Sequence, residues 1–121
     1  AMAAVAASST AMTAVAASST AISAMNASTA AKNALYNSPI RTRVVKSGTS
    51  WVTPFVAVSS GSGLFVKAYH GAVFPGNNGL KIDGSYVTAS KVATYDVVTR
   101  YTTSLGIDWY YDQSELVYIP C

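Results

Sequence analysis

The first 38 residues are built on a ten-residue repeat, and this repeat constrains the fold more than any other feature of the chain. AMAAVAASST at 1–10 is followed by AMTAVAASST at 11–20, AISAMNASTA at 21–30 and the degenerate AKNALYNS at 31–38. Alanine has the highest helix propensity, so the repeat predicts helix. Its large apolar residues recur at a spacing of three and then seven, and they predict a seam through which helices of an oligomer associate. The seam residues are Met2, Val5, Met12, Val15, Ile22, Met25 and Leu35.

A period of ten does not fit a regular heptad coiled coil. Ten residues over three turns give about 3.3 residues per turn, which is tighter than the 3.5 of a left-handed coiled coil. A straight helix would carry the apolar stripe round by about 80° per repeat. Either the helices supercoil steeply to the left, or short overwound stretches reset the phase. We therefore expect an alanine-rich, coiled-coil-like stalk, without predicting its register or handedness.

The repeat admits two other interpretations. An ice-binding helix would need its threonines on one face, and a spacing of ten does not keep Thr10, Thr20 and Thr29 aligned. A disordered Ala/Ser/Thr linker is the second alternative. The periodic Met and Val residues argue against a linker, because a spacer has no need of apolar residues at fixed positions.

The sequence pattern changes after Ser38–Pro39, because proline disfavours helix at the residue before it. Alternating apolar and polar residues then predict short strands, and Asp83–Gly84 predicts a tight hairpin. The chain is therefore expected to be α+β in segregated segments, with a helical stalk at 1–38 and a small all-β head at 39–121 whose open strand edges another copy would cover. The predicted strands are 41–46, 50–52, 55–58, 64–69, 81–82, 86–88, 92–103, 107–111 and 116–119.

Charge and composition argue against several classes of partner. The formal net charge is only +3, and Arg41, Arg43 and Lys46 are the only basic residues close together, so we expect no nucleic-acid partner. No run of about 20 strongly apolar residues is present, so we expect no membrane insertion. The single cysteine, Cys121, excludes an intrachain disulfide and is expected to be a free thiol.

The sequence offers little for catalysis or metal binding. His70 is the only histidine, so a histidine pair for a metal cannot be built within one chain, although three copies in a trimer could meet on its axis. Asp108 and Asp112 flank aromatic residues, as the carboxylates of a glycoside hydrolase would, but strand alternation makes an ordinary half-exposed strand the simpler interpretation. We therefore expect no enzyme, no cofactor and no metal.

Aromatic residues beside Gly, Asn, Asp or Thr are the candidates for ligand binding, because an aromatic ring can stack on a sugar while neighbouring polar groups fix its orientation. The segment 74–79, FPGNNG, is the strongest loop candidate for recognition. Trp51, Phe55 and Phe65 are expected to serve in packing instead. The predicted ligand-binding residues are Tyr69, Phe74, Asn77, Asn78, Tyr86, Trp109 and Tyr110.

Two segments of the chain resemble bacteriophage tail-fibre and tail-spike proteins. The decads of pattern A-M-x-A-V-A-A-S-S-T are similar to runs in such proteins, and they cover about a third of the chain. The segment 45–54, VKSGTSWVTP, is similar to the S-G-T-x-W-x-x-P opening of many tail-fibre tip domains. The glycine-dense strands that often follow in such tips are absent, since only Gly61 and Gly63 lie close together, so the fold of the tip does not carry over.

This resemblance implies an extracellular virion component, a homotrimeric tail fibre whose distal head attaches to a bacterial surface receptor, either a glycan or an outer-membrane component. The alternative is a purely structural module that trimerises or folds the fibre while recognition is located elsewhere in it. A depolymerase fragment is a third class, which the lack of an acid–base constellation disfavours. A test of whether the purified protein binds host cells is expected to distinguish an attachment fibre from a purely structural module.

Overall fold

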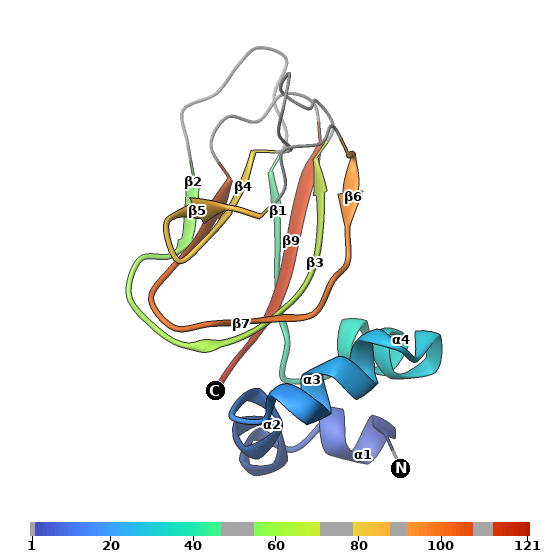
Figure 1. The fold of residues 1–121 in the computed structure, drawn as a ribbon. Helices are drawn as coiled ribbons and strands as arrows, with labels where there is room; N and C mark the ends of the chain where they lie inside the picture. The colour runs from blue at the N-terminus through green and yellow to red at the C-terminus, as the bar shows by residue number, and fades with distance from the viewer. Residues whose placement is uncertain (1, 47–54, 71–78, 88–91, 108–112) are drawn as a thin grey trace.

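The computed structural model describes residues 2–46, 55–70, 79–87, 92–107 and 113–121, and Figure 1 shows strands standing on a layer of short helices. The predicted α+β arrangement, with helices first and a small β head after them, is confirmed. The helices are α1 (Met2–Ala6), α2 (Ser9–Ala16), α3 (Ser19–Asn26) and α4 (Thr29–Tyr36). The strands are β1 (Thr42–Lys46), β2 (Phe55–Val58), β3 (Gly63–His70), β4 (Leu80–Ile82), β5 (Ser85–Tyr86), β6 (Thr94–Tyr95), β7 (Thr99–Tyr101), β8 (Leu105–Ile107) and β9 (Ser114–Pro120).

The ten-residue period produces one short helix per repeat. Ser8, Ser18 and Ser28 have extended backbone dihedrals and are the N-caps of α2, α3 and α4. Each serine hydroxyl accepts a hydrogen bond of 3.1–3.2 Å from the backbone N–H three residues later. Because such a cap begins a new helix, the helical path is interrupted in every full decad. The repeat therefore folds as separate short helices and not as the continuous stalk expected from the sequence.

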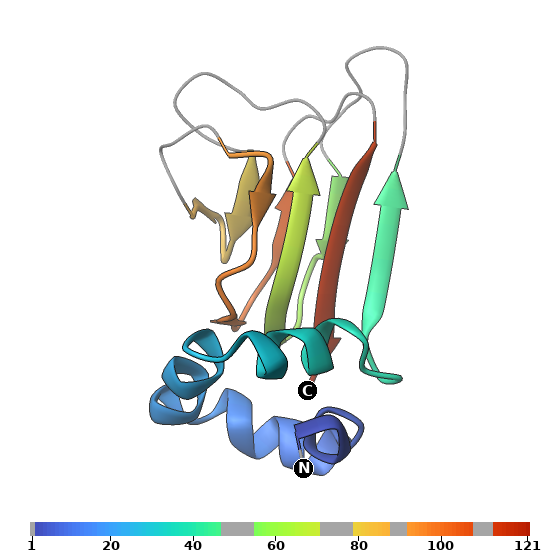
Figure 2. The same cartoon turned by 90° about the vertical axis from the view of Figure 1, so that its right-hand side faces the viewer.

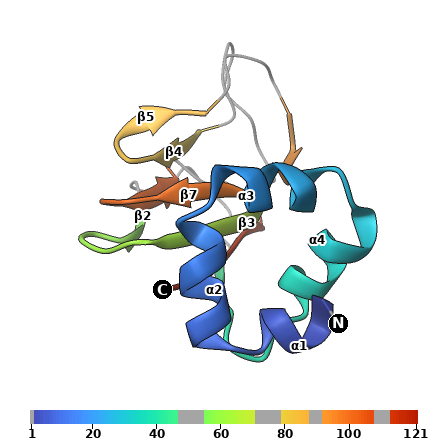
Figure 3. The ribbon, with the colours of Figure 1, turned by 60° about the horizontal axis from the view of Figure 1, so that its bottom comes forward.

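These helices turn in succession to form a ring, with α1 lying beside α4 (Figure 3). The buried hydroxyl of Ser38 donates a hydrogen bond to the carbonyl oxygen of Ala6 and so joins the end of the fourth decad to the first helix. Helices of eight residues or fewer are not stable alone in water. Their stability must therefore come from contacts around the ring and with the strands.

The sixth residue of each decad faces the strands. In the first two decads it is a buried alanine, which allows close approach of the helix. In the third it is Asn26, whose Nδ2 donates to the carbonyl of Val98 at 2.9 Å and whose Oδ1 accepts from the N–H of Val98 at 2.7 Å. In the fourth it is Tyr36, whose hydroxyl donates to Glu115 at 2.9 Å. One repeat position thus fixes all four described helices to the β region.

The strands form two antiparallel sheets. One sheet has the order β1-β9-β3-β6, with β7 also paired to β3, and the other has the order β2-β8-β4-β5. The predicted strands at 41–46, 55–58, 64–69 and 116–119 are confirmed, whereas 92–103 is divided into β6 and β7. The strand predicted at 107–111 begins earlier, as β8, and its later residues lie outside the described ranges together with 50–52.

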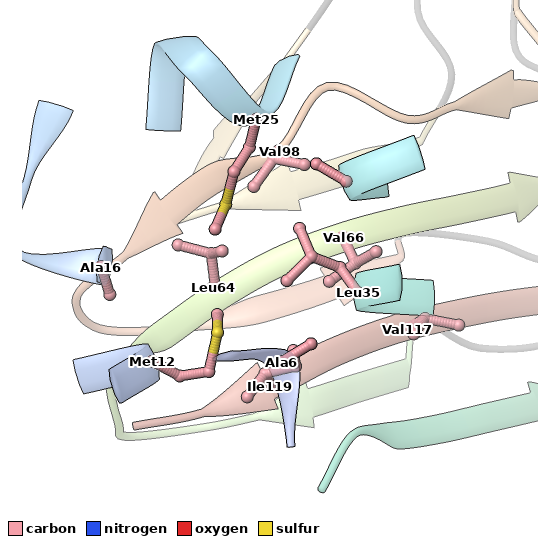
Figure 4. Packing of buried hydrophobic residues seen from close by; sticks show 11 residues of the cluster. Ala6, Met12, Ala16, Met25, Leu35, Leu64, Val66, Val98, Val117 and Ile119 are labelled. Atoms are coloured by element: carbon pink, nitrogen blue, oxygen red, sulfur yellow. The ribbon is translucent and has the colours of Figure 1, made fainter. Parts of the chain in front are cut away.

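Two apolar clusters hold the molecule together. One fills the space between the two sheets, and its largest members are Phe65, Tyr101 and Tyr118. The other lies between the five-stranded sheet and the ring of helices, where Met12, Met25 and Leu35 meet Leu64, Val66, Val98, Val117 and Ile119 (Figure 4). The boundary between residues 38 and 39 separates helices from strands, but the second cluster crosses it.

All seven predicted seam residues belong to the cluster beneath the ring. Met12, Met25 and Leu35 are buried there, and Met2, Val5, Val15 and Ile22 are partly buried against it. The sequence therefore located the packing positions, but in this structure their partners are strands and helices of the same chain.

The predicted hairpin at Asp83–Gly84 is confirmed, since the two residues have φ of 53° and 83° as a type I′ turn requires. The Asp83 carboxylate accepts hydrogen bonds from the backbone N–H groups of Thr102, Thr103 and Ser104 at 2.9, 2.7 and 3.2 Å. Desolvation acts to raise the pKa of Asp83, but the bonds from these three residues outweigh it and lower the pKa to about 2. The carboxylate thus joins the β4–β5 hairpin to the segment after β7.

We expect Asp83→Asn to lower the free energy of unfolding by about 1 kcal/mol at pH 7, after allowance for solvent screening of this exposed group. Asparagine suits the turn, so the change removes mainly the charge. Because the folded-state pKa is depressed, the stabilisation is present above pH 4 and is lost as the pH falls towards 2. Urea denaturation at pH 7, 4 and 2.5 should show the difference between the two proteins shrinking, and a constant difference would contradict this role.

Candidate functional site

The structure does not gather the predicted ligand-binding residues into one site. Tyr69 and Tyr86 are 40% and 46% exposed, and they lie on different sheets, in β3 and β5. Phe65 is buried between the sheets, as expected for a packing residue. Five further predicted residues lie outside the described ranges, namely Phe74, Asn77, Asn78, Trp109 and Tyr110.

An irregularity in β3 directs a lysine out of the sandwich. Phe65 pairs with Tyr118 of β9, whereas the next aligned pair is Lys67 with Val117, so Val66 is the extra residue of a bulge. In regular alternation Lys67 would follow Phe65 to the space between the sheets. The bulge instead places Lys67 on the face that carries the helices, and bulges commonly re-aim side chains in this way.

Lys67 lies beside a small cleft between α4 and the sheet, which we call the α4 cleft. Its volume is about 230 Å³. Figure 2 shows α4, in teal, crossing the lower ends of the strands. The ammonium nitrogen of Lys67 lies 4.9 Å from the centroid of the Tyr36 ring, a cation–π contact. The residues lining the cleft are Lys32, Asn33, Tyr36, Val66, Lys67 and Asp96.

The Tyr36 ring is held in place from the side of the sheet. Its hydroxyl donates to Oε1 of Glu115, and Nε of Arg43 donates to Oε2 of the same carboxylate at 2.7 Å. The hydrogen bond to Glu115 raises the pKa of Arg43. Glu115 is 8% exposed, and a buried carboxylate needs such partners to offset its desolvation. The aromatic wall of the cleft is therefore preorganised by an ion pair between the buried Glu115 carboxylate and the exposed Arg43.

The α4 cleft carries a positive charge that is incompletely compensated. Lys32 lies 3.7 Å from Asp96, whose side chain is 58% exposed, which makes a weak surface pair. Among the residues that the structure describes, no carboxylate lies within ion-pair distance of Lys67. Two lysines, one aspartate and an exposed amide suit binding of an anionic or polar ligand.

The sequence contained a signal for this site that the ligand-binding prediction missed. The fourth decad departs from the repeat at its second, third and sixth positions, where Lys32, Asn33 and Tyr36 replace the mostly small or apolar residues of the first two decads. All three of these residues line the cleft. Degeneration of the repeat next to the head domain is therefore the sequence signal that marks the helical side of the cleft.

His70 is buried and Cys121 is half-buried. His70 is 3% exposed, so three copies would have to leave buried positions to meet on a trimer axis. Cys121 is a free thiol, and burial raises its pKa, which leaves less of the reactive thiolate at neutral pH. Within the described ranges no three His, Cys, Asp or Glu residues are grouped as a metal site would require.

A second concavity lies within the ring of helices, and we call it the ring hollow. Its volume is about 400 Å³, it is open to solvent, and every residue that lines it belongs to the helical region. Its walls are mostly apolar and include Met2, Val5, Val15 and Met25. The described helices therefore leave apolar surface uncovered at their centre.

No protein-family model, curated protein or solved structure matches this chain. None of the helices in the described ranges has the length and hydropathy needed to span a bilayer.

Proposed function

We propose that this chain is a module of a bacteriophage tail fibre that assembles as a homotrimer in the virion and attaches it to a glycan receptor on the bacterial surface. The repeat region is the assembling part, and the β head with its α4 cleft is the recognising part. The resemblance of the decads and of the segment 45–54 to tail-fibre proteins supports this assignment.

The ring hollow is the observation that carries the assembly proposal. Apolar surface exposed to water is unfavourable, and an open apolar hollow of about 400 Å³ in a chain of 121 residues calls for a covering partner. Further copies of the chain offer matching apolar and small side chains from the same repeat. Association through the ring hollow does not require the helices to straighten into a coiled coil.

The edges of the sheets give additional support. β1 and β2 are edge strands of the two sheets, and they expose Val45 and Val56 at 40% and 62%. Unpaired strand edges with apolar side chains favour pairing with another chain. A trimer would protect these edges as well as the ring hollow.

The assembly is tested by one charged residue in the ring hollow. Ala24→Glu places a carboxylate on an exposed hollow-lining position, and we expect it to convert the trimer to monomers because a buried, unpaired charge is costly. Ala14→Glu is the matched control, since Ala14 is exposed at the same decad position and does not line the hollow. The measurement is molar mass by light scattering after size exclusion.

A wild-type monomer, or equal behaviour of the two variants, would overturn assembly through the ring hollow. Charges at Val15 or Ile22 are less informative, because both residues also pack against the core of their own chain. Replacing them with aspartate is expected to dissociate or destabilise the helical region, but it would not separate the two effects.

Attachment is tested by adding the fluorescently labelled trimer to a panel of bacterial strains and to a glycan array. We expect saturable binding to a subset of strains that competes with their purified surface polysaccharide. An intact trimer that binds no strain and no glycan would favour the alternative, a structural module that trimerises or folds the fibre while recognition is located elsewhere.

A further inference from the structure

We propose that the α4 cleft binds a single acidic sugar residue of a surface polysaccharide, with the sugar carboxylate at Lys67 and the ring lying towards Tyr69. This inference rests on the proposed attachment function and names its ligand class and its site. It places recognition at the junction of the repeat and the head.

The charge of the cleft selects an anion. The bulge in β3 brings Lys67 out of the sandwich, and the ammonium contacts the Tyr36 ring without a carboxylate partner among the described residues. A ligand carboxylate at this position would gain a charge-assisted hydrogen bond, which is stronger than a neutral one. Lys32 adds a second positive charge, because its weak pair with the exposed Asp96 compensates it only in part.

The remaining walls suit a hydroxylated ring. Asn33 is exposed and offers an amide that donates and accepts, while the Asp96 carboxylate accepts hydrogen bonds from sugar hydroxyls. Tyr69 is two residues beyond Lys67 on the same side of β3, about 7 Å along the strand, and its exposed ring can stack on a sugar. An anion without a ring would leave Tyr69 unused.

The size of the cleft limits the ligand to one sugar unit. Its volume of about 230 Å³ is below the roughly 300–1,000 Å³ that is typical of sites for drug-sized molecules. The Tyr36 wall is fixed through Glu115 and Arg43, so the site is largely formed before a ligand arrives. Binding to a single unit would be weak, and a trimer would raise the avidity for a repeating polymer by presenting three such clefts.

The test is titration of the ¹⁵N-labelled protein with glucuronate, followed by amide chemical shifts, with glucose and inorganic phosphate as comparison ligands. We expect saturable shifts for the amides of Asn33, Lys67 and Tyr69 with glucuronate, and much weaker ones with glucose. Lys67→Met is expected to weaken glucuronate binding at least about 10-fold, since a hydrogen bond to a charged group is lost. Lys67→Arg should retain binding.

Lys81→Met is the matched control. Lys81 also lies over a tyrosine, with its ammonium 5.0 Å from the Tyr86 ring, but it does not line the cleft. Its removal should leave glucuronate binding unchanged, and the spectrum of each variant reports whether it is folded. Tyr69→Ala is expected to weaken binding of glucuronate because the stacking ring is lost, while the amide of Lys67 should still shift on titration.

The outcomes separate the ligand class from the attachment function. Equal binding of glucose and glucuronate, unchanged glucuronate affinity of Lys67→Met, or phosphate binding as tight as glucuronate binding would overturn the acidic-sugar assignment even if the trimer binds bacteria. Glucuronate binding at the cleft by a trimer that binds no bacterial strain would instead contradict the attachment function.

Discussion

A chain carrying Leu35→Ala is expected to lose about 2–5 kcal/mol of its free energy of unfolding. Leu35 is fully buried in α4, within the cluster that joins the ring of helices to the five-stranded sheet (Figure 4). Truncation removes apolar burial and leaves a cavity that short, ring-closed helices cannot easily fill. Since small domains are stabilised by only about 5–15 kcal/mol in total, this change removes a large share.

The same experiment tests whether the helices and strands share one core. Urea unfolding followed at 222 nm for the helices and by the aromatic near-ultraviolet signal for the strands should give coincident transitions, both moved to lower urea by Leu35→Ala. Leu35→Met, which conserves volume, should cost less than about 1.5 kcal/mol. A helical transition that moves alone would show that the repeat melts independently of the head.

The second large effect is expected for Gly63→Ala at the start of β3. A Cβ atom there would lie 2.5 Å from the Tyr101 hydroxyl oxygen and closer still to the carbonyl oxygen of Ile119. The carbonyl belongs to the backbone of the neighbouring β9, so strand pairing has to shift to make room. Overpacking of this kind costs about 1–3 kcal/mol, and the backbone contact favours the upper end.

Gly61→Ala is the matched control, because its Cβ would meet only the Val58 side chain, at 3.2 Å. Thermal unfolding of the two variants should show a clear loss of melting temperature for Gly63→Ala and little change for Gly61→Ala. Equal melting temperatures would mean that β3 and β9 adjust without cost.

The sequence predicted the local states well where a residue acts through its own backbone preference. Alanine favours helix and Asp83–Gly84 makes the hairpin, and both effects operate over a few residues. The predicted change from helix to strand around Ser38–Pro39 is also observed, since α4 ends at Tyr36 and β1 begins at Thr42. The apolar residues of the decads were also recognised as packing positions. The partners of these residues could not be predicted in the same way. Leu35, for example, packs with strand residues some 30 to 80 positions later in the chain, and the periodicity of the repeat carries no information about such distant contacts.

The interruption of the helices has a sequence signal, the serine at each decad boundary. The prediction of a continuous stalk did not treat this serine as a helix N-cap. Ser-Ser-Thr or Ser-Thr recurs at each decad boundary, and the first serine of each is the N-cap, a position that serine strongly favours. The stalk predicted from the sequence instead continues as helix through these boundaries. With Ser8, Ser18 and Ser28 as caps, each ten-residue repeat forms eight helical residues and a turn. This explains why the period of ten does not fit a heptad coiled coil.

The α4 cleft could not have been assembled from the sequence alone. Lys32 and Tyr36 belong to the repeat, whereas Lys67 reaches them only because of the bulge at Val66. A bulge depends on how two strands pair, and no residue in GLFVKAYH marks it. The aromatic pattern singled out Tyr69, which does not line the cleft but lies two residues after Lys67 on β3; its role in ligand binding stays a prediction.

The serine caps have a consequence for how such a chain can change in length. Each decad contributes one helix and one corner of the ring, and the sixth residue of each must face the head. An insertion or deletion of any number of residues other than ten would move the following caps and head-facing residues out of step. We therefore expect natural length variants of this region to differ by whole decads, so that the repeat acts as a unit of growth as well as of packing.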